Sequence, residues 1–291
     1  MLLNKKISIF AFIKQIKFDI AAILSYSIIV GIADQYSFLA KISIPIGVTS
    51  VIGTALSLLL AFRTSQAYER WWEARGVWGA IVNDSRTLIR QLIQFTPQDS
   101  NNKKMVEKFA DRQIIWCYAL GESLRKLPFS KKVQDYLDTQ KITEKNIPNA
   151  ILNQHSDALS QLDISEFKQV QIDITLGRLC DAMGKCERIK NTVFPKSYSL
   201  LVHFLIYVFA TLLPFGLDDK YVTIEIFLTT LLPLIFIAIE RTAIILQDPF
   251  ENAPTDIPMT SLATTVEINI KEMTGNENLP TQENSKSFYI M

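Results

Sequence analysis

The sequence predicts an all-α membrane protein in which four membrane-spanning helices accompany a helical cytoplasmic domain. Residues 42–62 contain no Asp, Glu, Lys, Arg or His. Only 20% of the 291 residues are charged, and most of the charges lie in the middle of the chain. One charge at the centre of a membrane helix costs about 2.5–3.5 kcal/mol, so uncharged runs of about 20 residues favour membrane helices.

Four segments have the length and composition of membrane helices: about residues 18–37, 42–62, 199–217 and 223–246. The second segment mixes Gly, Ser and Thr with Ile, Val and Leu, a composition that lets a helix pack closely or face a cavity. The fourth contains Glu225 near its start and Glu240 and Arg241 near its end.

The distribution of basic residues predicts the topology of these segments. The short links at 34–41 and 218–221 carry two positive and three negative charges. Basic residues gather at the opposite ends of the segments: Lys5, Lys6, Lys14, Lys17, Arg63, Arg70, Arg75, Lys185, Arg188, Lys190 and Lys196. Because cytoplasmic loops are enriched in Lys and Arg, both termini and the middle of the chain are expected in the cytoplasm, with the helices in the inner membrane.

The middle of the chain, residues 63–198, is expected to form the helical cytoplasmic domain. Apolar residues recur at helical spacing in three stretches: 66–95, 105–127 and 166–195. Pro128 and Pro195 end the second and third of these helices. No helix breaker lies between Arg63 and Ala74, so the second membrane helix is expected to run straight into this domain.

The bounds of the membrane segments and of the cytoplasmic domain predict the organisation of the whole chain. An N-terminal segment and the first two membrane helices precede the cytoplasmic domain, and the last two membrane helices, a cytoplasmic loop and helix, and a disordered tail follow it. The predicted parts span residues 1–62, 63–198, 199–247, 248–273 and 274–291. The tail has the polar composition typical of disorder.

Charge and motif content argue against several functions. The net charge of +1 provides no basic surface for nucleic acid. The chain contains no GxSxG, P-loop, HExxH or GxGxxG motif, so we do not expect an enzyme. Cys117, Cys180 and Cys186 form no CxxC pair, and the last two are interpreted as buried thiols rather than zinc ligands.

The two histidines differ in their surroundings. His155 lies in the polar stretch NQHSD, which predicts a solvated loop. His203 lies within the third membrane segment, where an ionisable residue is a candidate for function. A hydrogen bond from His203 to a neighbouring residue is the alternative interpretation.

The polar stripe of the second membrane segment is the most informative pattern. Thr54, Leu58 and Phe62 are spaced by four residues and share one face of a helix. This face either packs against a neighbouring helix or, in several copies around an axis, forms apolar rings. Such rings can gate an ion path, because an ion must lose water to pass them.

Oxygen-bearing side chains follow the fourth membrane segment in the loop LQDPFENAPTDIPM. Asp248, Glu251, Asn252 and Asp256 supply the hard oxygen ligands that Ca²⁺ prefers. From their spacing alone, an ordinary polar loop is the favoured interpretation.

Three stretches of the chain resemble the bestrophin family, and in particular its prokaryotic members: SLLLAFRTSQAYERWWEARGVWGAIVNDSRTLIRQ, GKCERIKNTVFPKSYSLLVHFLIYVFATLLPFGL and DPFENAPTDIPMTSLATTVEINI. The resemblance covers about residues 15–273, with the three stretches in the family's order. It implies a homopentamer around a central ion pore.

The resemblance also implies site residues. Thr54, Leu58 and Phe62 would line the neck of the pore, where Thr54 replaces the usual aliphatic residue and makes the outermost ring wetter. Counting back from CERI and Pro195, a cytoplasmic aperture falls near Phe167.

Animal members of the family are Ca²⁺-activated anion channels, and the acidic residues after their fourth helix match Asp248 and Asp256 best. The usual acidic run before DPF is replaced here by Ile244, Ile245, Leu246 and Gln247. This replacement removes charge from the implied Ca²⁺ site, and no other cofactor is implied.

The sequence therefore predicts a channel that passively conducts small monovalent ions, chloride or other anions by family and cations as the alternative. Its expected partners are further copies of itself, the lipid bilayer and small inorganic ions. A non-conducting membrane scaffold or sensor is the main alternative function, and a membrane enzyme with a cytoplasmic catalytic domain is the third.

Overall fold

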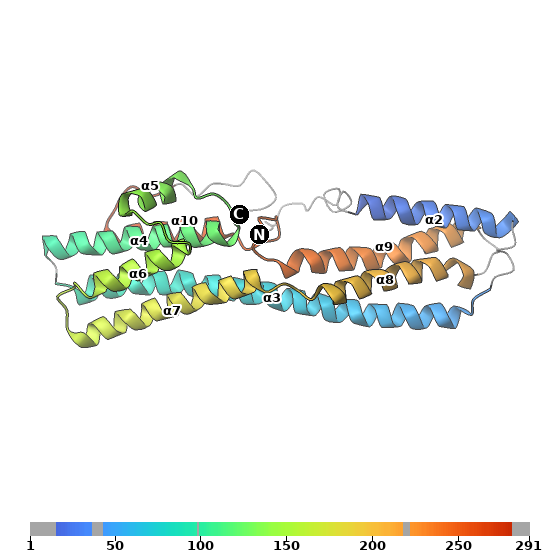
Figure 1. Ribbon diagram of the computed structural model, residues 1–291, viewed down its shortest axis with the longest axis horizontal. Helices are drawn as coiled ribbons and strands as arrows, with labels where there is room; N and C mark the ends of the chain where they lie inside the picture. The colour runs from blue at the N-terminus through green and yellow to red at the C-terminus, as the bar shows by residue number, and fades with distance from the viewer. Residues whose placement is uncertain (1–15, 37–42, 98, 218–221, 281–291) are drawn as a thin grey trace. The chain divides into compact units, whose positions relative to one another are not determined.

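The computed structural model describes residues 16–36, 43–97, 99–217 and 222–280, which contain helices and no β-strand. Figure 1 shows the helices in chain order. The prediction of an all-α fold is therefore confirmed for the described part of the chain. The links at 37–42 and 218–221, which entered the topology prediction, and the last eleven residues of the predicted tail lie outside the described residues.

The chain divides into two compact units. The apolar unit comprises the described residues of 16–70 and 193–248, and the polar unit those of 71–192 and 249–280. The divisions fall at 70/71, 192/193 and 248/249, compared with predicted domain limits at 62/63, 198/199 and 247/248.

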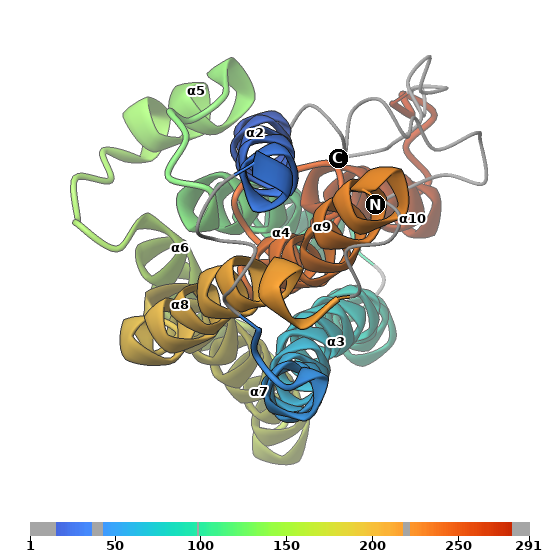
Figure 2. The ribbon, with the colours of Figure 1, turned by 90° about the vertical axis from the view of Figure 1, so that its right-hand side faces the viewer.

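The apolar unit contains α2 (Lys17–Tyr36), the first part of α3 (Ile46–Phe95), α8 (Lys196–Leu212), the short 3₁₀ helix η2 (Pro214–Gly216) and α9 (Val222–Gln247). These helices run alongside one another (Figures 1 and 2). Helix α8 stops at Leu212 and η2 follows it, within the third predicted membrane segment at about residues 199–217. Pro214 lacks a backbone N–H, so the α-helical hydrogen-bond pattern does not continue through it, and the chain goes on as the short η2 helix.

Two helices in the described residues, α3 and α9, are each long and apolar enough to cross a membrane. A third candidate span requires the consecutive helices α7 and α8 to be counted together. The four-span topology therefore remains a prediction.

Close helix contacts hold the apolar unit together around Leu56, Leu60, Ile206, Phe209 and Ile237. A Cβ atom on Gly31 of α2 would lie 2.8 Å from Ile226 Cγ1 of α9, so the missing side chain permits the approach of these helices. Phe209 also packs edge-on against Phe236, with ring centroids 5.2 Å apart.

The polar unit contains the second part of α3 with α4 (Ser100–Leu124), α5 (Lys131–Gln140), α6 (Ile147–Leu159), α7 (Glu166–Asn191) and α10 (Met259–Thr274). The α3 helix is unbroken over 50 residues, which confirms that the second membrane segment continues into the following helix. Helix α4 is central because it packs against α5, α6, α7 and α10. Asp99 caps its first turn by accepting hydrogen bonds from the N–H groups of Asn101 and Asn102.

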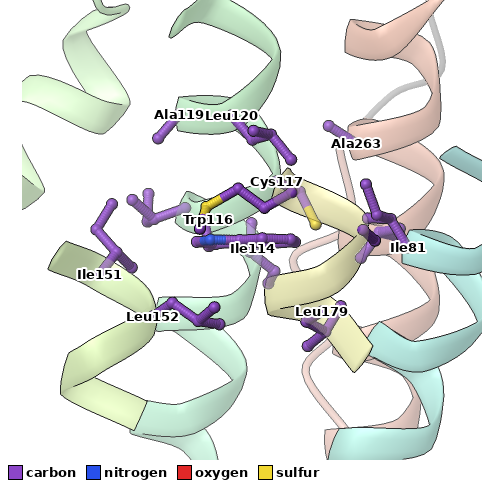
Figure 3. Packing of buried hydrophobic residues seen from close by; sticks show 14 of the residues in the cluster. Ile81, Ile114, Trp116, Cys117, Ala119, Leu120, Ile151, Leu152, Leu179 and Ala263 are labelled. Atoms are coloured by element: carbon purple, nitrogen blue, oxygen red, sulfur yellow. The ribbon is translucent and has the colours of Figure 1, made fainter. Parts of the chain in front are cut away.

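The core of the polar unit forms around buried side chains of α3, α4, α6 and α7 (Figure 3). The Trp116 ring lies among Ile114, Leu152 and Leu179. Cys117 is also buried there, and burial raises the pKa of its thiol to about 12. Trp116 and Cys117 both lie on the buried side of α4.

Two expectations about side chains in the polar unit are wrong. Cys186 is buried as expected, but Cys180 is exposed, because it turns to the outer side of α7. His155 does not lie in a solvated loop but is fully buried on α6. It shares the inner side of this helix with Ile151 and Leu159, which outweighs the polar residues beside it in the sequence.

His155 is buried without hydrogen-bond partners for either ring nitrogen among the described residues. Its ring stacks on Phe109, with centroids 5.3 Å apart. Burial, with a smaller effect of the nearby Arg112 charge, lowers the pKa of His155 well below its ordinary value. The folded polar unit therefore holds this imidazole neutral.

Replacing His155 with Leu should remove part of the acid sensitivity of the polar unit. The wild-type imidazole stays neutral in the folded protein but takes up a proton on unfolding. Above about pH 6.5, the ionisation of His155 does not change the free energy of unfolding. Below this pH, the free energy of unfolding declines by about 1.4 kcal/mol for each pH unit. Hydrogen exchange of the α6 amides, measured at about pH 7.5 and 5.5, should show a smaller acid-dependent loss of protection in His155→Leu.

The matched control is His203→Leu, which removes the chain's other histidine from the apolar unit. It should keep the wild-type acid dependence in α6. Equal acid dependence in the wild type and His155→Leu would contradict this role of His155.

Candidate functional site

An exposed apolar stripe runs along the first part of α3. Leu58 is 58% exposed and Phe62 is 59% exposed, and Thr54, one turn before Leu58, is also exposed. Leu56 and Leu60 of the same helix are 0% and 1% exposed. Since an α-helix turns by about 100° per residue, Leu58 and Leu56 project about 160° apart. One side of α3 therefore packs inside the apolar unit, while none of the described residues covers the opposite side.

The hydroxyl groups near this stripe are satisfied within α3 itself. Thr54 Oγ1 donates a hydrogen bond to the Ser50 carbonyl at 2.8 Å, and Ser57 Oγ donates to the Gly53 carbonyl at 2.8 Å. Such bonds to the preceding turn leave no hydroxyl hydrogen that requires another partner. The stripe thus presents methyl groups, aliphatic and aromatic carbon, and oxygen lone pairs.

Arg63 directly follows the stripe but points into the apolar unit, where it is 1% exposed. Its Nη1 atom lies 3.1 Å from Glu240 Oε1 of α9, and its Nη2 donates to Ser199 Oγ of α8 at 2.8 Å. Glu240 is 2% exposed. A buried charge without such a partner would cost several kcal/mol, so this ion pair restricts the rotation of α3.

His203 is the second partner of the Glu240 carboxylate. Its Nδ1 lies 3.0 Å from Glu240 Oε2, so both carboxylate oxygens are engaged. We call Arg63, Ser199, Glu240 and His203 the polar network. It joins α3, α8 and α9, and it supports the interpretation of His203 as a residue that hydrogen-bonds a neighbour.

A second ion pair connects α9 to α2. Arg241 Nη2 lies 3.4 Å from Asp19 Oδ2, and Tyr207 donates to Asp19 Oδ1 at 3.3 Å. Sequence reasoning noted Glu240 and Arg241 only as charges in an apolar segment and did not pair them. The sequence signal for these ion pairs was the presence of charged residues in an otherwise apolar segment. Such charges need partners inside a membrane protein.

The residue predicted to form a second constriction, Phe167, lies in the first turn of α7 and is 87% exposed. Val170 and Ile174 follow it at helical spacing and are also exposed. The polar unit therefore carries its own exposed apolar stripe, of which the sequence indicated one member.

The residues predicted to bind Ca²⁺ belong to different units. Asp248 ends the apolar unit, and its carboxylate lies 3.9 Å from Arg70 Nη2. Asp256 is buried in the polar unit, where its Oδ2 accepts a hydrogen bond from the Ala253 N–H. Burial raises the pKa of Asp256. Its carboxylate holds the turn that contains Asn252, whose φ is +68°.

Within the described residues, no group of three or more His, Cys, Asp or Glu side chains could hold a metal ion. A Ca²⁺ ion takes six to eight oxygen ligands, so these acidic side chains alone do not fit it. The Ca²⁺ site remains a prediction that rests on the family resemblance, and no step of the mechanism below depends on it.

Comparison with known proteins identifies the family of this all-α membrane protein. Residues 7–272 match the family model described as Bacterial/Fungal Bestrophin protein. The voltage-dependent anion channel-forming protein YneE of Escherichia coli (strain K12) is 30% identical over 243 residues, covering 80% of this chain and 78% of that protein. The voltage-dependent anion channel-forming protein RSc3414 of Ralstonia nicotianae is 26% identical over 249 residues, covering 83% and 81%.

Solved structures agree with this match. The crystal structure of a bacterial bestrophin homologue from Klebsiella pneumoniae superposes with a TM-score of 0.83 at 28% identity. The match covers 90% of this chain and 99% of that one. The chain therefore belongs to the bestrophin family, a family of ion channels rather than enzymes, and it is an integral membrane protein. The resemblance seen in the sequence is confirmed.

Replacing Glu240 with Ala should destabilise the apolar unit by about 3–5 kcal/mol, because it leaves the buried Arg63 guanidinium without its carboxylate. The matched control is Glu73→Ala, which removes the carboxylate of the exposed Arg188–Glu73 pair. The control should cost less than about 1 kcal/mol. Chemical denaturation in detergent measures both changes, and equal losses of stability would contradict a special role of the buried pair.

Proposed function

We propose that the protein is a bestrophin-type channel that passively conducts small monovalent ions, above all chloride and other anions, through a pore on the common axis of five copies. One observation carries the proposal: the exposed apolar stripe on α3, on the side of the helix opposite its packed residues. The relatives named as anion channel-forming proteins support anion conduction. Cation conduction is the alternative selectivity.

In the described part of the apolar unit, the helices of a single copy pack against one another through Leu56, Leu60 and Phe209. Several copies of α3 can instead surround a space that none of them encloses alone. In this arrangement Leu58 and Phe62 form consecutive apolar rings at the neck. Such rings control flux by their width and wetting, since an ion must lose part of its water to pass.

Thr54 would form the outermost ring of the neck. Its hydroxyl hydrogen is used within α3, but its oxygen lone pairs remain available to water. This ring is therefore wetter than the rings of Leu58 and Phe62. On the same proposal, Phe167 of the polar unit lines the cytoplasmic aperture.

The proposed location is the inner membrane, with the polar unit and both termini in the cytoplasm. The basic residues at the ends of the predicted membrane segments support this orientation through the positive-inside rule. The proposed partners are further copies of the same chain, the surrounding lipid and the conducted ions.

Reconstitution of the purified full-length protein in planar bilayers tests the function. With unequal KCl concentrations on the two sides, we expect a current whose reversal potential lies toward the chloride equilibrium potential. A reversal potential near the potassium value would instead support the cation alternative. Reproducible absence of current from folded protein would contradict a channel and favour a scaffold or sensor.

Replacing Leu58 with Ala should widen and wet the neck and raise the single-channel conductance on the order of twofold. The smaller side chain removes apolar surface from the narrowest part of the proposed path. Single-channel recording in planar bilayers measures this effect without depending on the number of channels.

The matched control for Leu58→Ala is Leu56→Ala, the same change on the buried side of the same helix. It should cost about 2–5 kcal/mol of stability but leave the conductance of the remaining channels unchanged. An unchanged conductance in Leu58→Ala, or an equal increase in both variants, would contradict the assignment of the neck.

A further inference from the structure

The polar network places a compensated charge directly behind the exposed stripe. Arg63 is the first charged residue after an uncharged run that begins at residue 42, and it adjoins Phe62 in the chain. Its backbone therefore belongs to the helix turn that carries Phe62, while its side chain turns away into the apolar unit. Any net charge at this position lies within one helix turn of the proposed neck.

Among the described residues, one carboxylate compensates the charge of Arg63. Glu240 is the carboxylate paired with Arg63, through Nη1 and Oε1 at 3.1 Å. The other neighbours of the guanidinium are neutral: Ser199 Oγ accepts a hydrogen bond at 2.8 Å, and the centroid of the Phe194 ring lies 5.6 Å from Arg63 Cζ. The remaining oxygen of Glu240 faces His203, so the carboxylate is held in place from both sides.

Burial makes the balance of charge important for ions nearby. Arg63 and Glu240 are both almost completely shielded from solvent. Electrostatic effects in such surroundings are screened far less than at an exposed surface. An unbalanced charge behind the neck would therefore act on every ion that passes, and a symmetric assembly would repeat it in each copy.

We propose that Glu240 determines the charge selectivity of the neck by neutralising Arg63, so that the rings of Leu58 and Phe62 select ions without a fixed charge behind them. This inference rests on the proposed function. On this proposal, Glu240 of α9 faces away from the ion path but sets the electric field within that path.

Two single substitutions should shift selectivity in opposite directions. Glu240→Gln keeps the size of the side chain but leaves the positive charge of Arg63 unbalanced, so the chloride-to-potassium permeability ratio should rise at least about threefold. Arg63→Gln leaves the negative charge of Glu240 unbalanced, and the ratio should fall by a similar factor. The double variant Arg63→Gln/Glu240→Gln restores neutrality and should return the ratio to the wild-type value.

The ratio is obtained from the reversal potential of the full-length protein in planar bilayers under a KCl gradient. A purely structural role of the ion pair would change the number of active channels but not this potential. The matched control is Arg241→Gln, which removes the neighbouring cation of α9, whose partner Asp19 lies on α2. It should change the ratio by much less than either single substitution.

The outcomes separate the inference from the function on which it rests. A wild-type protein without current contradicts the channel itself. The proposed role of Glu240 is overturned if the wild type conducts but both single variants keep the wild-type chloride-to-potassium permeability ratio. It is also overturned if both variants shift this ratio in the same direction. If one single variant does not fold, the other decides, since a shift in its predicted direction supports the inference and an unchanged or opposite ratio overturns it.

Discussion

The buried ion pair between Arg63 and Glu240 is the constraint on which the arrangement of the apolar unit depends. A buried pair of this kind adds little net stability, because the cost of removing both charges from water offsets their attraction. The pair does, however, exclude other rotations of α3 about its own axis. A rotation of α3 that exposed Leu60 would leave Arg63 and Glu240 separated in an apolar environment. The pair thus fixes which side of α3 is covered and leaves Leu58 and Phe62 uncovered.

The same constraint connects the fold to the proposed function. Apolar side chains that the described residues of their own chain leave exposed call for lipid, another copy or a water-filled path beside them. On α3 they form a narrow stripe at four-residue spacing, opposite a packed and charged side. This division suits a helix that lines a shared axis, because the lining stays apolar and uncharged while the polar network supports it from behind. The proposed selectivity then depends on width, wetting and a balanced charge.

Helical periodicity and charge content predicted much of this structure from the sequence. The uncharged run and the absence of breakers after Arg63 predicted the long α3 helix, and apolar spacing predicted helices in the stretches that form α4 and α7. The errors have physical reasons. His155 was assigned from its polar neighbours, although its position on α6 buries it, and Cys180 was interpreted as buried like Cys186, although it lies on the exposed side of α7.

Pairing between distant residues could not be predicted in the same way. Arg63 and Glu240 are 177 positions apart in the sequence, and their contact depends on how α3 and α9 pack. The sequence showed only that each charge adjoins or interrupts an apolar segment. Likewise, the spacing of Thr54, Leu58 and Phe62 identified a common face without deciding what it contacts, which left packing and pore lining as equal interpretations.

A structure of the assembled full-length protein in lipid nanodiscs, determined by electron cryomicroscopy, tests the central claim most directly. The account predicts a ring of five copies in which Leu58 and Phe62 of every copy face one common axis. Side chains of Leu58 and Phe62 that face lipid, or an assembly whose axis is closed to ions by other residues, would contradict it.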